Sequence, residues 1–343
     1  MTSLDFVFLD HDDVVASLPP IEDSIRVVEQ GLRAHGLGEV VLPPKSHIRL
    51  DDRFGGHFNV LPGYVGPIER AGVKLIGDYV GNLEHGLPTE IAVLLLADPR
   101  TGAPQALMDA TEITWLRTGC VTAIGARHLA RPDSAVLGHV GARGTALSNV
   151  LALAALFPLR EVRIASRHSA TRARLARQVR DRTGITAVAV DSVRDAVVGA
   201  DIVVEATRLT SPQVLIEDSW LAPGVCLVTY GWVMALDPAI AARFDKLVVD
   251  DWEQCRRGGQ LYPLIERGEL GRERIHAEIG AIVAGHAVGR EGPAERNLFW
   301  HRGFAVSDIV LGDAVLARAK AAGRGRLLTL WRDSPEPRPE GTA

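Results

Sequence analysis

The chain has 343 residues, of which 47% are apolar and 23% charged, and its formal net charge is −4. These proportions are typical of a globular protein with one or two domains and a sizeable core. The weakly acidic balance, with no Lys/Arg-rich run among aromatic residues, argues against a nucleic-acid partner. Cys120, Cys226 and Cys255 form no CxxC or Cys/His pair with metal spacing, so we expect reduced thiols and no metal site.

The N-terminal segment MTSLDFVFLDHDDVV carries acidic residues where a signal peptide would carry positive charge. No uninterrupted apolar stretch approaches the roughly 20 residues that a membrane span requires. We therefore expect a cytoplasmic protein with no membrane partner.

The first third of the chain predicts a mixture of helices and strands. Residues 20–38 place Ile21, Ile25, Val28 and Leu32 at helical spacing. Strand-like segments follow at 73–80, 90–99 and 103–110, and the turn residues of DPRTGAPQ predict that the last two pair antiparallel. A long helix is expected from 111 to about 129, ended by the proline of ARPDS.

From about residue 135 to 251, apolar strands alternate with helices. The strands are short, rich in Val and Ile and continuously apolar, as in a parallel sheet that is covered on both faces. They are expected at 135–140, 161–166, 185–190, 201–206, 225–230 and 246–251, with helices at 146–157 and 169–183. This alternation predicts a doubly wound parallel sheet.

Residues 307–323 predict one more amphipathic helix, stopped by glycine, and the proline-rich segment 333–343 predicts a loose tail. The fold class expected for the whole chain is α/β: a Rossmann-like doubly wound sheet plus an α+β domain.

The stretch AVLGHVGARGTALSN (135–149) resembles a dinucleotide-binding turn. In G-x-G-x-x-G, the first glycine makes the bend, the second lets pyrophosphate approach, and the third permits close packing of helix on strand. Gly141 suits the first role and Ala146 the third, but Arg143 occupies the second. Arg143, Gly144 and Thr145 together offer a cation, a flexible backbone and a hydroxyl at a helix start, so we expect an altered but working phosphate site. A βα turn without a ligand is the alternative.

Several further segments, in order, are similar to the ornithine cyclodeaminase/mu-crystallin family. An LRT-containing helix leads into ARPDS and then the glycine turn, and the likeness extends from about residue 49 to 322. The other matching segments are GVKLIG, GLPTEIAVLLLADPRTGAPQALMDATEIT, VRDAVVGADIVVEAT, WLAPGV, LVVDDWEQ and HAEIGAIVAG. The resemblance implies a substrate-binding and dimerisation domain (1–118 and 305–343), a Rossmann dinucleotide-binding domain (119–304), a nicotinamide cofactor, an amino-acid-like substrate and a homodimer.

The resemblance also implies roles for three cations in holding the substrate carboxylate: Lys74 in VKLI, Arg117 in LRT, and Arg49 in HIRL, whose alignment is looser. A lysine in an apolar strand is costly to bury unless it meets an anion, which gives Lys74 a physical reason to be there. For each of the three, the alternative is a salt-bridged or snorkelling side chain.

The expected cofactor is NADP(H), with NAD(H) as the alternative. NAD binding usually requires an Asp or Glu at the end of the second strand, whereas this chain has Ser166, Arg167 and His168 there. Arg167 suits a 2′-phosphate, unless it is only a solvated surface residue. We also assign Thr207 and Arg302 to cofactor binding.

The family's cyclodeaminases carry an aspartate after the strand that corresponds to 225–230, where this chain places Val233, and Asp237 aligns instead with the start of the next helix. Deamination with ring closure would lack its usual proton carrier. His301, beside Arg302, is expected to titrate near neutral pH and to be catalytic together with Lys74, although a structural role is equally compatible. His57 is expected at the substrate.

The leading hypothesis is therefore an NADP(H)-dependent oxidoreductase of an imino or amino acid. Two alternatives remain open: an ornithine or lysine cyclodeaminase-type lyase with bound NAD, and a non-catalytic NADPH-binding protein of the crystallin type.

Overall fold

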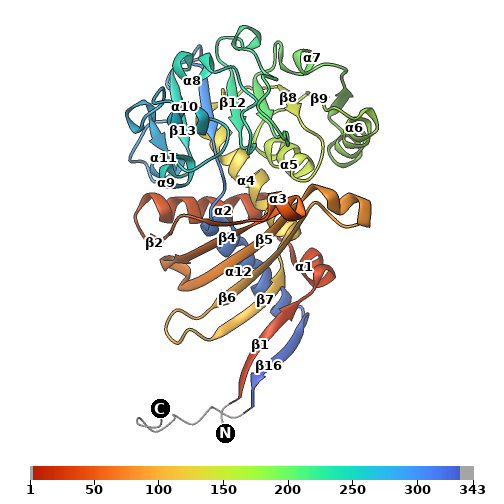
Figure 1. Cartoon of the computed structure of the whole chain (residues 1–343), viewed down its shortest axis with the longest axis vertical. Coiled ribbons are helices and arrows are strands. Elements are labelled where there is room, and N and C mark those ends of the chain that lie inside the picture. The colour runs from red at the N-terminus through yellow and green to blue at the C-terminus, as the bar shows by residue number, and fades with distance from the viewer. Residues whose placement is uncertain (1–2, 333–343) are drawn as a thin grey trace.

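The computed structural model describes residues 3–332 and contains two eight-stranded sheets, each in its own lobe (Figure 1). The lower lobe in the figure is built from residues 4–109 and 305–331, and the upper lobe from residues 136–300. The predicted combination of a Rossmann-like sheet with a second α+β unit is what the structure shows.

The lower sheet is mixed. Its strand order is β16-β1-β7-β6-β5-β4-β2, with β3 paired to β4, and the pair β1–β7 is parallel. The predicted hairpin between β6 and β7 is confirmed, and Gly102 adopts the positive φ of +73° that its turn requires. The strands are β1 (Leu4–Leu9), β2 (Val40–Val41), β3 (Ser46–Arg49), β4 (Gly56–Val65), β5 (Arg70–Tyr79), β6 (Glu90–Ala97), β7 (Pro104–Asp109) and β16 (Arg326–Trp331).

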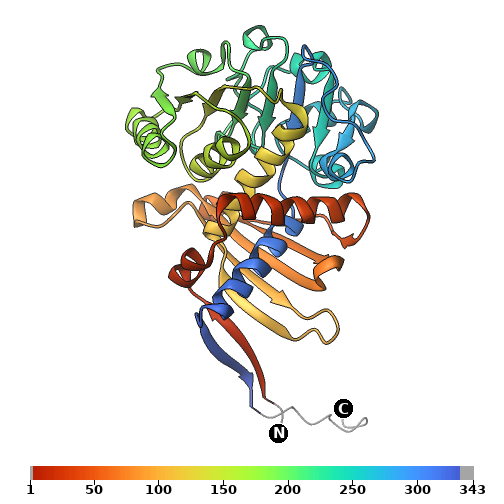
Figure 2. The ribbon, with the colours of Figure 1, turned by 180° about the vertical axis from the view of Figure 1, so that it is seen from behind.

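Helices cover one face of this sheet (Figure 2). The lobe's helices are α1 (His11–Ser17), α2 (Ile21–Gly36), α3 (Asp51–Phe54) and α12 (Ala305–Ala321). The predicted apolar stripe of α2 is buried at Ile25, Val28 and Leu32, while Ile21 at its first turn is only partly buried. Strand alternation leaves the other face of the sheet with exposed apolar side chains, among them Leu75, Ile91 and Val93.

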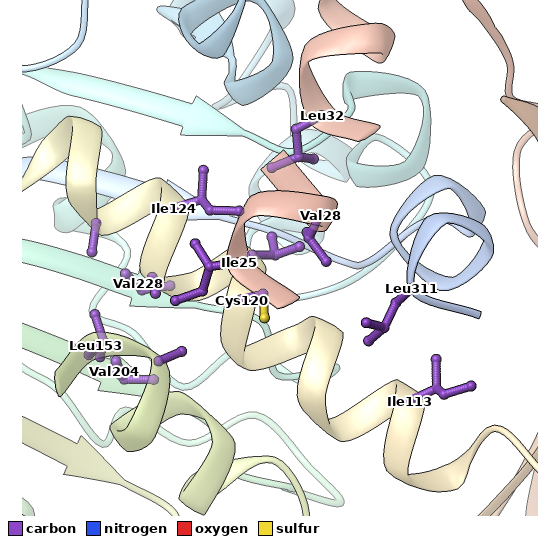
Figure 3. Close-up of a cluster of buried hydrophobic side chains, with 14 of the residues drawn as sticks. Ile25, Val28, Leu32, Ile113, Cys120, Ile124, Leu153, Val204, Val228 and Leu311 are labelled. Carbon is purple, nitrogen blue, oxygen red and sulfur yellow. The ribbon is translucent and has the colours of Figure 1, made fainter. Parts of the chain in front are cut away.

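A single long helix, α4 (Thr111–Leu129), connects the two lobes, with the bounds that the sequence predicts. It follows β7 of the lower sheet and leads into β8 of the upper one. Most of its residues are buried, because α2, α5 and α12 pack around it. The two lobes therefore share one apolar core, which includes Ile113, Cys120 and Ile124 of this helix (Figure 3).

The upper sheet is entirely parallel, in the order β10-β9-β8-β11-β12-β15-β13-β14. All six predicted strands are present. The strands are β8 (Val136–Val140), β9 (Glu161–Ala165), β10 (Thr186–Ala189), β11 (Ile202–Glu205), β12 (Cys226–Thr229), β13 (Lys246–Val249), β14 (Ala277–Glu278) and β15 (Asn297–Trp300). The last two were not predicted, although β15 lies between β12 and β13.

Short helices join these strands: α5 (Ala146–Leu156), α6 (Ser169–Thr183), α7 (Val193–Val197), α8 (Ala239–Arg243), α9 (Trp252–Cys255), α10 (Tyr262–Glu266) and α11 (Ile279–Val283). The three cysteines are free and buried. Within residues 3–332, no helix has both the length and the apolar character needed to cross a membrane. The predicted tail at 333–343 lies outside the described residues.

Candidate active site

A cavity of about 700 Å³ lies between the two lobes. Its upper wall consists of the segments that follow the carboxyl ends of β8, β9, β11, β12 and β15, and its lower wall comes from β4, β5, β6 and α4. The crevice outside the carboxyl ends of parallel strands is where open α/β sheets bind their ligands.

All but one of the residues expected at the site line this cavity. They are His57, Lys74, Arg117, Gly141, Arg143, Gly144, Thr145, Ser166, Arg167, Thr207, His301 and Arg302. Arg49 is the exception. It is exposed at the end of the edge strand β3, and its guanidinium lies 5.8 Å from the ring centroid of Trp232. Because Trp232 lines the cavity, Arg49 lies next to one of its walls, and its contact with the substrate stays a prediction.

At the deep end of the cavity, two cations share one buried carboxylate. The Lys74 ammonium donates to Asp308 Oδ1 at 2.7 Å and to Thr114 at 3.2 Å, and Arg117 Nε donates to the same Oδ1 at 3.0 Å. Gly303 makes room for this guanidinium, since a Cβ there would collide with it. Lys74 and Arg117 are therefore both ion-paired, as the alternative interpretation of the sequence expected. Asp308 carries only one negative charge, so it balances only one of the two positive charges.

Burial and the neighbouring Arg117 lower the pKa of Lys74 to about 8, although Asp308 opposes the shift. Lys74 is therefore mostly charged at pH 7 and loses its charge within the slightly alkaline range. A carboxylate ligand at this point would favour the charged form.

A further lysine of the cavity, Lys45, was missed by the sequence analysis, and desolvation together with Arg302 holds its pKa well below its usual range. The Lys45 ammonium donates to the carbonyl oxygens of Arg302 and Gly303, at 2.7 and 3.3 Å. Buried Asp250 accepts the backbone N–H groups of the same two residues at 2.8 and 2.7 Å. Lys45 follows two prolines in a segment that shows no helix or strand periodicity, so only the fold reveals that it lines the cavity.

His301 lines the cavity and directly follows β15. Its ring lies 4.7 Å from that of Tyr230 and 5.1 Å from that of Phe299, and its Nε2 lies 3.1 Å from the Thr122 hydroxyl. Burial, with Arg117 and Lys45 nearby, holds the pKa of His301 well below its usual range. The expectation that it titrates near neutral pH is wrong, because both desolvation and the positive neighbours disfavour the imidazolium.

The glycine turn has the geometry of a diphosphate cradle. Gly141 has a φ of +109°, and a Cβ there would lie 2.5 Å from the Ala206 carbonyl oxygen. No side chain caps the first turn of α5. Ala146 N already donates to the Arg143 carbonyl oxygen at 3.2 Å, and the N–H groups of the next two residues are available to an anion. Arg143 is exposed, lines the cavity and forms no ion pair within the described chain. The Thr145 hydroxyl is already bonded to the Tyr230 hydroxyl at 2.6 Å.

The residues that end β9 provide positive charge and no carboxylate. Ser166, Arg167 and His168 line the cavity, and Arg167 is exposed. Arg172 donates to the Ser166 carbonyl oxygen at 3.0 Å and is ion-paired with Asp191 from the neighbouring strand end. These residues fit the adenosine end of a nicotinamide dinucleotide, and the glycine turn fits its diphosphate.

The loop after β12 presents Trp232 to the cavity. Val233 follows it, and Asp237 accepts a hydrogen bond from Ala239 N at the start of α8 at 2.9 Å. The expectation that this loop supplies no cavity carboxylate agrees with the structure.

A group of potential metal ligands, His35, Asp251 and Glu278, lies elsewhere at the lobe interface. His35 Nε2 lies 3.3 Å from Asp251 Oδ2, and Trp252 N donates to Glu278 at 3.1 Å. Both contacts join segments of the protein to one another, so we assign no metal to the group.

A parallel sheet with a glycine turn after its central strand β8, facing a cavity with buried cations, defines a nucleotide-dependent enzyme of the Rossmann type. The chain belongs to the ornithine cyclodeaminase/mu-crystallin family, whose model matches residues 7–323.

Three similar proteins illustrate the class. Alanine dehydrogenase from Archaeoglobus fulgidus is 31% identical over 322 residues, which are 93% of this chain and 97% of the relative. The structure of Thermococcus litoralis Δ1-pyrroline-2-carboxylate reductase with NADH and L-proline has a TM-score of 0.89 at 28% identity and covers 94% of this chain and 99% of its own. An archaeal alanine dehydrogenase dimer with bound NAD also has a TM-score of 0.89, at 30% identity, and covers 96% of this chain and all of its own.

These comparisons confirm the predicted family, the fold class and the class of activity, an oxidoreductase of amino or imino groups with a nicotinamide cofactor. The cofactors named for the solved relatives are NAD and NADH.

Proposed function

We propose that this protein is an NADP(H)-dependent oxidoreductase that interconverts a small imino acid and the corresponding amino acid. The observation that carries the proposal is one continuous cavity with a diphosphate cradle at one end and the Lys74–Arg117 cation pair at the other. A carboxylate held by that pair would be fixed relative to the reacting carbon, which lowers the entropic cost of reaching the transition state.

In this proposal, Lys74 and Arg117 bind the substrate carboxylate. The partly buried Lys45 lies on the same cavity wall, although desolvation and Arg302 hold its pKa well below its usual range. The nicotinamide, when bound, supplies or accepts a hydride at the substrate carbon. His301 is neutral and its Nδ1 has no hydrogen-bond partner within the described residues, so it is available to orient a polar group of either ligand. His57 would contact the substrate from β4.

The preference for NADP(H) over NAD(H) rests on Arg167, with Ser166 beside it. An exposed guanidinium and a hydroxyl at the end of β9 suit a 2′-phosphate, whereas a ribose diol is usually bound by a carboxylate at this point. Gly141, Arg143, Gly144 and the α5 N-terminus would hold the diphosphate, and Thr207 and Arg302 would contact the cofactor from the neighbouring strand ends.

We further propose a homodimer, formed through the uncovered face of the lower sheet. Three apolar side chains are partly exposed there: Leu75 at 37%, Ile91 at 42% and Val93 at 41%. An apolar face of this kind is typical of a subunit interface. The domain division at residues 118/119 and 304/305 is part of the same proposal.

The cyclodeaminase-type lyase is the second candidate, because the same family contains it. Val233 in place of a carboxylate counts against it, since ring closure after deamination needs a proton carrier.

An assay that monitors cofactor absorbance separates the two functions. The protein is incubated with NADPH or NADH and Δ1-pyrroline-2-carboxylate, or with pyruvate and an amine, and separately with ornithine or lysine and catalytic NAD. Oxidation of NADPH with an imine supports the proposal. Release of ammonia from ornithine without net cofactor turnover would establish the lyase instead.

A further inference from the structure

Glu90 is a cavity carboxylate to which nothing above gives a role. It is the first residue of β6 and lies directly opposite Asp78 of β5, which in turn lies opposite His57 of β4. Side chains alternate between the faces of a strand, so Glu90 points to the same face as buried Ala92 and Leu94. Lys74 is on this face too. The four titratable residues of these strands all line the cavity: His57, Lys74, Asp78 and Glu90.

The charges around Glu90 favour a substrate that carries both a carboxylate and a cationic nitrogen. Lys74 and Arg117 carry two positive charges, and Asp308 carries one negative charge. Glu90 is close enough for both cations to favour its ionised form, which adds a second negative charge. Lys74, Arg117, Asp308 and Glu90 together are then neutral. A bound substrate carboxylate would leave an excess negative charge, which a cationic nitrogen on the substrate would cancel. The cavity thus matches a zwitterion, with its carboxylate at the cation pair and its nitrogen at Glu90.

Arg208 leaves Glu90 available for this task. Its guanidinium reaches across from the segment after β11 and pairs with Asp78, and it lies 3.9 Å from Glu90 Oε1. Asp78 is therefore the main partner of Arg208. Burial raises the pKa of Glu90, as a proton carrier at near-neutral pH requires, while Lys74 and Arg117 limit the shift.

We propose that Glu90 carries the proton at the substrate nitrogen, in place of the aspartate that the loop after β12 lacks. The inference rests on the proposed function. In reduction, the Glu90 carboxylic acid gives its proton to the imine nitrogen while the substrate carbon receives the hydride, and the electron pair of the C=N double bond forms the new N–H bond. In oxidation, the ammonium first loses one proton to water, and the Glu90 carboxylate then takes an N–H proton of the neutral amine while the hydride leaves the substrate carbon, so that the C=N double bond forms. Exchange with water restores the starting form in either direction.

The pH dependence follows from the same step. Reduction requires protonated Glu90 and therefore slows as the pH rises through its pKa, whereas oxidation speeds up. The charged and titratable groups that face Glu90 from the surrounding elements are Lys74 and Asp78 of β5, His57 of β4, Arg117 of α4, Arg208 after β11 and Tyr230 after β12.

The test compares Glu90→Gln with the matched variant Asp78→Asn. Asp78 lies opposite Glu90 on the neighbouring strand β5, and its substitution weakens the ion pair with Arg208. The kcat and KM for Δ1-pyrroline-2-carboxylate, or for whichever imine the wild type reduces, are measured across the pH range. We expect Glu90→Gln to lower kcat by about 100-fold or more and to remove the limb of the pH profile that belongs to the acid. Asp78→Asn should keep that limb and move it to lower pH, because the Arg208 guanidinium is then free to pair with Glu90.

A binding readout accompanies the kinetics. With the reduced cofactor bound, calorimetry compares L-proline with tetrahydrofuran-2-carboxylate, which has an ether oxygen in place of the nitrogen. Glu90→Gln should reduce the preference for L-proline by about tenfold, whereas Asp78→Asn should retain it.

The outcomes separate the two proposals. If the wild type reduces imines and Glu90→Gln matches it in kcat, pH profile and proline preference, the assignment of Glu90 is overturned and the proposed function stands. If the wild type reduces no imine with either cofactor, the proposed function itself fails, and the assignment of Glu90 fails with it.

Discussion

The two ends of the cavity hold their positive charges in opposite ways. At the deep end, Lys74 and Arg117 are buried and fixed by Asp308. At the outer end, Arg143 and Arg167 are exposed and form no ion pair within the described residues. The deep cations are thus positioned before a ligand arrives, at a cost that Asp308 offsets, whereas no ion pair within the described residues fixes the outer ones. Substitutions should therefore affect folding and chemistry at the deep end, and cofactor affinity at the outer end.

Removal of the shared carboxylate should have the largest effect. Asp308→Asn removes the carboxylate that both buried cations contact directly, so the free energy of unfolding should fall by about 3–5 kcal/mol. Urea denaturation measures the loss. The control is Asp313→Asn, also on α12, where the carboxylate pairs with the partly exposed Arg70 and the loss should be about 1 kcal/mol or less. Equal losses in the two variants would show that the deep cluster is not special.

The charge on Lys74 should set the alkaline limit of substrate binding. Because its pKa is about 8, the ammonium is charged below this pH and neutral above it, so the KM for a carboxylate substrate should rise as the pH passes through 8. Lys74→Arg, which keeps its charge, should move this rise out of the measured range, whereas Lys320→Arg on α12 should leave it in place. A rise in KM that persists unchanged in Lys74→Arg would assign it to another group.

At the outer end, Arg167→Ala should weaken NADPH binding by about 10- to 100-fold and change NADH binding little. The reason is that a charged hydrogen bond to the 2′-phosphate contributes about 1.5–3 kcal/mol. Fluorescence titration of both cofactors gives the ratio, with Arg174→Ala on the exposed side of α6 as the control. An equal loss for NADH and NADPH would contradict the role of Arg167.

The smallest effect is expected at the unusual turn residue. Arg143→Gly restores the usual glycine and removes one exposed cation, so the dissociation constant of NADPH should rise only about threefold to tenfold. The salt dependence of binding should become shallower, because one charge fewer meets the diphosphate. Tighter binding in Arg143→Gly would show that the guanidinium obstructs the turn.

Local pattern was sufficient for much of the fold. The six strands of the upper sheet that were predicted are continuously apolar, and α4 is bounded by a strand and by ARPDS, so neighbouring residues determine them. Strand β15 was missed because NLFW is short and its place between β12 and β13 depends on pairing with segments distant in the sequence. Strands β1 and β16 were also missed, and they pair with each other from opposite ends of the chain.

The site divides in the same way. The residues of the glycine turn could be predicted because their segment carries a motif. Lys74 and Arg117 could be predicted because their segments resemble those of a known family. For Arg49 the sequence leaves the position open, because a four-residue edge strand does not reveal which of its side chains faces the cavity. The pKa of His301 depends on its burial, which the sequence does not show. Lys45 and Glu90 line the cavity because the two lobes pack against each other there, and the sequence does not show this packing either.

Isotope transfer tests the central claim most directly. The protein is incubated with a cyclic imino acid and NADPH that carries deuterium at the transferable C4 position, and the product is analysed by mass spectrometry and NMR. A cavity that holds both ligands as proposed should yield the amino acid with one deuterium on its α-carbon. Amino acid without the label, or release of ammonia with the cofactor unchanged, would contradict the account.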